Sequence, residues 1–204
     1  TSASGKLAMI HNGIIENYAQ IKQELLKKGY QFTSDTDTEV LLNFIDDIHI
    51  NNGGALEEAI RIALRRVVGA YVIVVLDEEN PDTLIAARKG SPLVIGIGKG
   101  EHFLASDASP IIEYTKEVVY VNDYELAIIK SDELILENLG NEKITPFIIK
   151  RDMVMAAIEK GGYEANFNGE AYSSILFQNA NHSVRVTDEF MQAIEKNQRW
   201  ATHW

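Results

Sequence analysis

The stretch "AYVIVVLD" (residues 70–77) decides the fold class, because nearly all of it is apolar. A strand with one face in water alternates polar and apolar residues, so a continuously apolar strand is covered on both faces. The stretch "PLVIGIG" (92–98) has the same character, and the short connections between these segments favour antiparallel pairing. We therefore predict an α+β fold, with helices on one side of a sheet and a second sheet on the other.

The residues before this stretch predict three helices and one short strand. Residues 7–10 are typical of a buried strand, and the apolar spacing that begins at Ile14 predicts a helix over about residues 14–28. The capping-box pattern Thr36-x-x-Glu39 predicts the start of a second helix, and a third is expected over about residues 55–67.

Composition excludes several classes of protein. Hydrophobic residues make up 46% and charged residues 24%, as in an ordinary globular domain. The net charge of −11 argues against a nucleic-acid or anionic-membrane partner, and no apolar run is long enough to span a membrane. Cysteine is absent, so no disulfide can form. We expect a cytoplasmic protein, and no oligomeric state follows from the sequence.

Two groups of residues in the first part of the chain could carry chemistry. His11-Asn12-Gly13 separates the predicted strand from the predicted helix, and backbone N–H groups beside an Asn amide suit a developing oxyanion. A plain turn is the alternative interpretation of this tripeptide. At the start of the second helix, capping explains Thr36 and Glu39 but leaves Asp37 as a candidate for binding a substrate ammonium group.

The end of the chain, "RWATHW" (199–204), is a third candidate site. Arg199, Thr202 and His203 would suit recognition of a carboxylate, because arginine binds carboxylates bidentately; the alternative is a frayed aromatic tail. The five histidines show no metal-ligand spacing and no thiol is present, so we expect no metal and no cofactor.

Several of these stretches together resemble a known family. "HNGIIENY", "TDTEV", "GAYVIVVLD", "DTLIAARKGSPLVIGIG", "FLASDASPI" and "ITPFI" are similar, in order and spacing, to the glutaminase domain of the glucosamine-6-phosphate synthase family, a class II glutamine amidotransferase. The resemblance implies an N-terminal-nucleophile fold, an αββα sandwich of two antiparallel sheets. It also implies L-glutamine as the substrate and a sugar-isomerase domain as the partner that receives ammonia.

The resemblance also implies roles for single residues. Asn12 and Gly13 match the oxyanion hole, Asp37 matches a residue that holds the amino-acid end of glutamine, and "RWATH" matches a substrate-binding motif. The family motif that carries the nucleophilic cysteine has no counterpart here, and "RWATHW" comes last in the chain where the family has it before "HNG". Thr1 is not expected to replace the cysteine.

These departures lead to an expected division of the chain into residues 1–149, the glutaminase-type core, and residues 150–204, without a firm assignment. Two accounts of the second segment remain open: a circularly permuted N-terminal part, or the start of a linker to the isomerase domain. The fold is accordingly expected to be incomplete or permuted. The resemblance implies the glutamine-hydrolysing, ammonia-supplying domain of an aminotransferase that makes glucosamine 6-phosphate from fructose 6-phosphate and glutamine. We expect this chain to be inactive, because it lacks the cysteine nucleophile. The alternative is a non-catalytic glutamine- or glutamate-binding module or an engineered scaffold.

Overall fold

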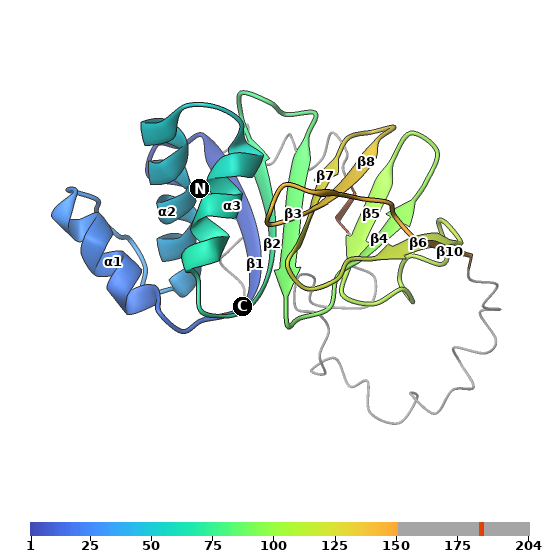
Figure 1. Cartoon of the computed structure of the whole chain (residues 1–204), viewed down its shortest axis with the longest axis horizontal. Helices are drawn as coiled ribbons and strands as arrows, with labels where there is room; N and C mark the ends of the chain where they lie inside the picture. The colour runs from blue at the N-terminus through green and yellow to red at the C-terminus, as the bar shows by residue number, and fades with distance from the viewer. Residues whose placement is uncertain (151–183, 186–204) are drawn as a thin grey trace.

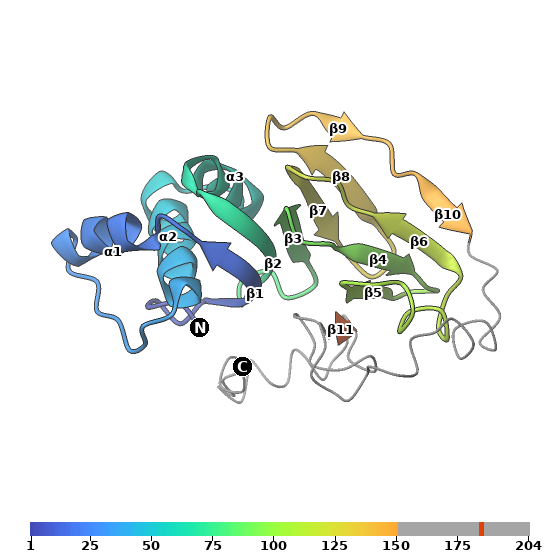
Figure 2. The same cartoon turned by 90° about the horizontal axis from the view of Figure 1, so that it is seen from below.

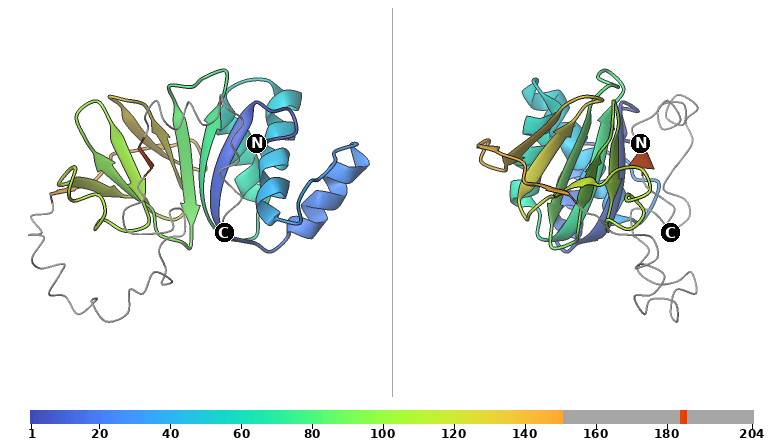
Figure 3. Two further views of the ribbon diagram at one scale, coloured as in Figure 1. Left: turned by 180° about the vertical axis from the view of Figure 1, so that it is seen from behind. Right: turned by 90° about the vertical axis from the view of Figure 1, so that its right-hand side faces the viewer.

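The structure is a computed structural model that describes residues 1–150 and 184–185. Two antiparallel sheets pack face to face, and the helices lie on the outer side of the larger sheet, where the first helix packs mainly against the second helix (Figure 1). The same order of layers is visible from behind (Figure 3). The α+β sandwich predicted from "AYVIVVLD" is therefore confirmed, with both faces of that strand covered.

The six-stranded sheet has the order β1-β2-β3-β7-β8-β9, and the five-stranded sheet has the order β10-β6-β4-β5-β11. The chain passes from β9 in the first sheet to β10 in the second (Figure 2). The helices are α1 (Tyr18–Lys27), α2 (Asp37–Asn52) and α3 (Leu56–Arg66). The strands are β1 (Leu7–Ile15), β2 (Gly69–Asp77), β3 (Leu84–Lys89), β4 (Val94–Ile97), β5 (His102–Ala105), β6 (Glu117–Tyr120), β7 (Glu125–Ile129), β8 (Leu134–Asn138), β9 (Lys143–Ile144), β10 (Ile148–Lys150) and β11 (Val184–Arg185).

The alternation of side chains along each strand divides the apolar residues between separate cores. In β2, Tyr71, Ile73 and Val75 pack toward the helices, whereas Val72 and Val74 belong to the core between the two sheets. A third cluster on the outer face of the smaller sheet contains Val94, Phe103, Ala105, Ala108, Ile111 and Val118. No helix among the described residues covers that face, so the described part supplies three of the four layers of an αββα sandwich.

The first strand is longer than the sequence suggested. β1 continues to Ile15 and α1 begins only at Tyr18, so the prediction of a helix from residue 14 is wrong at its start. Antiparallel pairing with β2 holds this segment extended, with Asn12 opposite Val72 and Ile15 opposite Gly69. Ile14, which fitted the helical spacing, is 69% exposed. Cross-strand pairing therefore overrides the helical pattern at its start. Within α1, only Ile21 and Leu25 of that pattern are buried.

Candidate functional site

Gly13 lies inside β1, where the backbone of β2 comes unusually close. Its φ is +125°, and a Cβ built there would lie 2.1 Å from the carbonyl oxygen of Ala70. Gly69 on β2 meets the same constraint, because its Cβ would lie 2.1 Å from the carbonyl oxygen of Ile14. His-Asn-Gly is therefore part of a strand and not a turn between elements. Only glycine at position 13 lets this strand approach its neighbour so closely. The Gly69 counterpart was missed, although it directly precedes "AYVIVVLD".

Asp37 is brought to β1 by the start of α2. It is the first residue of that helix, and its Oδ2 accepts a hydrogen bond of 2.8 Å from the backbone N–H of Ile15. Its carboxylate thus lies two residues along the strand from Gly13, although the two residues are 24 positions apart in the sequence. The structure therefore places the two predicted site elements, Asn12-Gly13 and Asp37, side by side.

The same hydrogen bond shows which way the backbone of β1 points. The N–H of Ile15 leaves the β1–β2 ladder to reach Asp37, and β1 is the end strand of its sheet among the described residues. N–H groups two residues apart on an antiparallel strand point to the same side. We infer that the N–H of Gly13 also points to this side of β1, which no described strand pairs with. There it could donate a hydrogen bond to an acceptor on a ligand.

The side chain of Asn12 leaves the strand on the opposite face from that of His11, because successive residues of a strand alternate. It is half-buried, and within the described residues its amide makes no hydrogen bond. An amide that structural bonds do not use keeps both donors for another partner. Asn12 and Gly13 together therefore present a side-chain donor and a backbone donor from adjacent residues.

His11 packs beneath Asp37 on the helix side of the sheet. Its Nδ1 lies 2.9 Å from Thr38 Oγ1 and 3.9 Å from Asp37 Oδ1. Its Nε2 is buried and has no partner among the described residues. Burial lowers the pKa of the imidazole, and the charge of Asp37 opposes this only in part. His11 and Thr38 were missed as site residues, although each directly neighbours a predicted one in the sequence.

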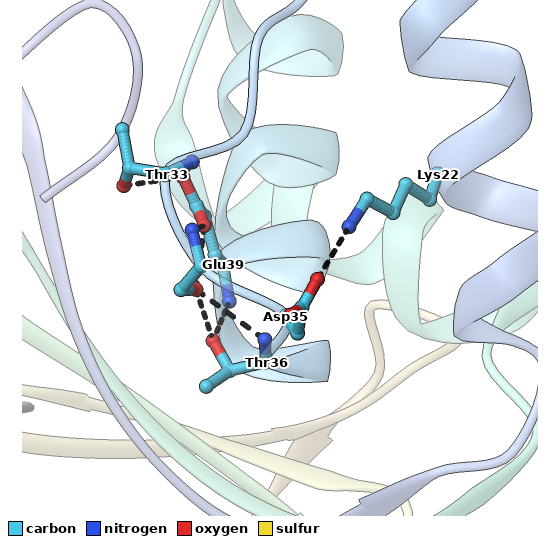
Figure 4. Close-up of polar contacts among 6 residues, drawn as sticks. Lys22, Thr33, Asp35, Thr36 and Glu39 are labelled. Carbon is cyan, nitrogen blue, oxygen red and sulfur yellow. Dashed lines mark hydrogen bonds and ion pairs between the residues drawn. The ribbon is translucent and has the colours of Figure 1, made fainter.

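The loop before α2 explains why Asp37, and not Asp35, faces the strand. Thr36 Oγ1 accepts a hydrogen bond from the Glu39 N–H, and the Glu39 carboxylate accepts the N–H groups of Thr33 and Ser34 (Figure 4). This arrangement confirms the predicted cap at Thr36. The Asp35 side chain points to solvent, with Lys22 Nζ 3.8 Å away. Asp35 therefore carries the same charge at the same loop without contacting β1.

The remaining predicted site residues, Arg199, Thr202 and His203, lie outside the described residues, as does most of the segment 150–204. Among the described residues, no three His, Asp or Glu side chains gather in a way that could hold a metal ion. None of the described helices is long and apolar enough to cross a membrane.

Comparison with known proteins shows the family to which the chain belongs. A family model described as "Glutamine amidotransferase domain" matches residues 1–113. Curated relatives named glutamine–fructose-6-phosphate aminotransferase [isomerizing] include one from Bacteroides thetaiotaomicron, 53% identical over 163 residues, which are 79% of this chain and 26% of the relative. Another, from Chlorobaculum tepidum, is 50% identical over 164 residues, covering 80% of this chain and 27% of the relative. The chain therefore spans about a quarter of the length of these relatives.

A solved structure supports the same assignment from the fold. The glutamine phosphoribosylpyrophosphate amidotransferase of B. subtilis superposes with a TM-score of 0.58 at 28% identity, over 68% of this chain and 30% of that one. The sheet sandwich is thus of the N-terminal-nucleophile amidotransferase type. On the family match, the relatives and the fold, this chain belongs to the glutamine amidotransferase domain family.

Proposed function

We propose that the chain is the glutamine-binding, ammonia-supplying part of an aminotransferase that makes glucosamine 6-phosphate from fructose 6-phosphate and glutamine. The names of the relatives support this substrate pair, and a sugar-isomerase domain would be the partner that uses the ammonia. The single observation that carries the proposal is the position of the Asp37 carboxylate on β1, two residues from Gly13. That arrangement offers one site for a cation and one for a developing anion, two strand residues apart.

The chemistry of glutamine fits these two ends. Attack on the side-chain amide turns its carbonyl oxygen into an oxyanion, which the Asn12 amide and the Gly13 N–H would stabilise as preorganised donors. Asp37 would bind the α-ammonium group through a charge-assisted hydrogen bond with the carboxylate oxygen that faces away from Ile15. Arg199, Thr202 and His203 would bind the α-carboxylate, by their match to the family motif.

The missing component is the nucleophile. Formation of a thioester needs a thiol, and none of the 204 residues is a cysteine. The chain as it stands would therefore bind glutamine in the geometry for hydrolysis without cleaving it.

Calorimetric titration of the 204-residue chain with L-glutamine, beside an assay for released ammonia, tests this function. We expect heat of binding and no ammonia. Release of ammonia would overturn the assignment of a missing nucleophile, and absence of any heat would overturn glutamine binding and favour a scaffold.

A matched pair of variants locates the ammonium site. Asp37→Asn removes the charge but keeps an oxygen that can accept the Ile15 N–H, so the fold should persist. Loss of one charge-assisted hydrogen bond, about 1.5–3 kcal/mol, corresponds to a roughly tenfold to hundredfold weaker Kd. Asp35→Asn, at the solvent-facing carboxylate two residues away, should change the Kd by less than about twofold. Equal effects of the two substitutions would show that Asp37 does not contact the ligand.

A further inference from the structure

We propose that His11 is a positioning residue that couples glutamine binding at Asp37 to pH: the neutral imidazole leaves the carboxylate to the ligand, and the protonated imidazole competes for it. The inference rests on the proposed function, since it concerns the same ammonium site. It assigns a role to a buried, titratable side chain that the reaction itself does not use.

The geometry links three side chains in a row. His11 comes from β1, and Thr38 and Asp37 come from the first turn of α2. The imidazole Nδ1 is within hydrogen-bond distance of Thr38 Oγ1, at 2.9 Å, but only within ion-pair distance of Asp37 Oδ1, at 3.9 Å. Asp37 Oδ2 is already engaged by the Ile15 N–H, so Oδ1 is the oxygen for which a ligand ammonium and His11 would compete.

The surroundings of His11 favour the neutral imidazole near pH 7. Its side chain is 2% exposed, and on β2 the residue directly opposite is the uncharged Ile73. From α2, Asp37 is the one charged group of the described part that acts on the ring, and Thr38 is polar but uncharged. Nε2 has no acceptor among the described residues, so a second ring proton would be buried without a partner.

Protonation would change what the ligand meets. An imidazolium at 3.9 Å would form an ion pair with Asp37 and would repel the α-ammonium group of glutamine. Glutamine therefore binds the form with neutral His11 more tightly, and by linkage its affinity falls as the pH drops through the pKa of His11. Because burial sets that pKa below 6.5, the fall should occur on the acid side of 6.5.

The test is the glutamine Kd of the 204-residue chain measured by calorimetry from about pH 8 to about pH 5, a range over which free glutamine keeps its charges. The Kd of the unmodified chain should be constant at the upper end and then rise by up to about tenfold per pH unit below the pKa of His11. His11→Asn should lose this rise of the Kd at acid pH, because the amide offers a polar atom near the position of Nδ1 and does not titrate. Protonation of His203 at the α-carboxylate would lower the Kd, so it cannot produce the same rise. His49→Asn, at the other end of α2, should keep the full pH profile.

A second measurement needs no variant to fold. Nuclear magnetic resonance titration of the His11 ring should give a lower pKa with saturating glutamine than without it. An unchanged pKa, a flat Kd profile in the unmodified chain, or the same acid loss in His11→Asn would each overturn the role of His11. Those results leave glutamine binding itself intact, whereas absence of binding at every pH would overturn the proposed function and this inference with it.

Discussion

Replacement of Gly13 by alanine should destabilise the protein far more than an ordinary glycine substitution. The new Cβ would lie 2.1 Å from the Ala70 carbonyl oxygen, 2.8 Å from its carbonyl carbon and 2.9 Å from the Tyr71 Cα. All three are backbone atoms that cannot rotate away. The φ of +125° adds strain of about 1–3 kcal/mol, and forcing β1 from β2 costs about 1–3 kcal/mol more. The total of about 2–6 kcal/mol is a large share of the stability of a typical domain.

Gly29→Ala provides the matched control for this prediction. Gly29 follows α1 with a φ of +91°, but a Cβ there would have no atom within 4 Å. Only conformational strain remains, about 1–2 kcal/mol. Urea unfolding followed by circular dichroism should show a larger loss of unfolding free energy for Gly13→Ala at an unchanged m-value. If both variants lose the same free energy, the close approach of the two strands does not exist and the glycine requirement is conformational alone.

Three further predictions concern other parts of the fold. Arg61→Met should cost about 3–5 kcal/mol, because it leaves Glu137 buried without its ion pair, and adding Glu137→Leu should recover most of this loss in urea unfolding. Burial would raise the pKa of Glu39, but hydrogen bonds from Ser34 and Thr33 outweigh it and lower that pKa. The unmodified chain should therefore have a higher free energy of unfolding than Glu39→Gln above pH 4.5. This difference should disappear as the pH falls through the pKa of Glu39 in the folded state, as unfolding measured at several pH values would show. Burial, with the charges of Asp47 and Asp46, raises the pKa of Tyr30 to about 12. Ultraviolet titration should therefore show one tyrosine that ionises only near this pH, and this step should be absent in Tyr30→Phe. The free energy of unfolding should fall as the pH rises from 10 to about 12.

The layered fold could be predicted because it depends on local patterns. Unbroken apolar strands such as "AYVIVVLD" require cover on both faces, and turn residues such as Gly140 and Asn141 separate the strands of the β8–β9 hairpin. The cap at Thr36 is equally local, because its hydroxyl accepts from an N–H three residues on. The start of α1 could not be predicted this way, since pairing with β2 keeps Ile14 and Ile15 extended.

The site divides along the same line. The sequence by itself determined the α+β class and singled out Asn12, Gly13 and Asp37, since these depend on residue type, spacing and family resemblance. Only the tertiary structure decided that Asp37 binds the backbone of β1, that Gly13 and Gly69 bring two strands into contact, and that His11 lies under the carboxylate. Arg61 and Glu137, 76 positions apart, likewise form a buried ion pair. Such contacts join residues far apart in the chain, and no local pattern records which of them will meet.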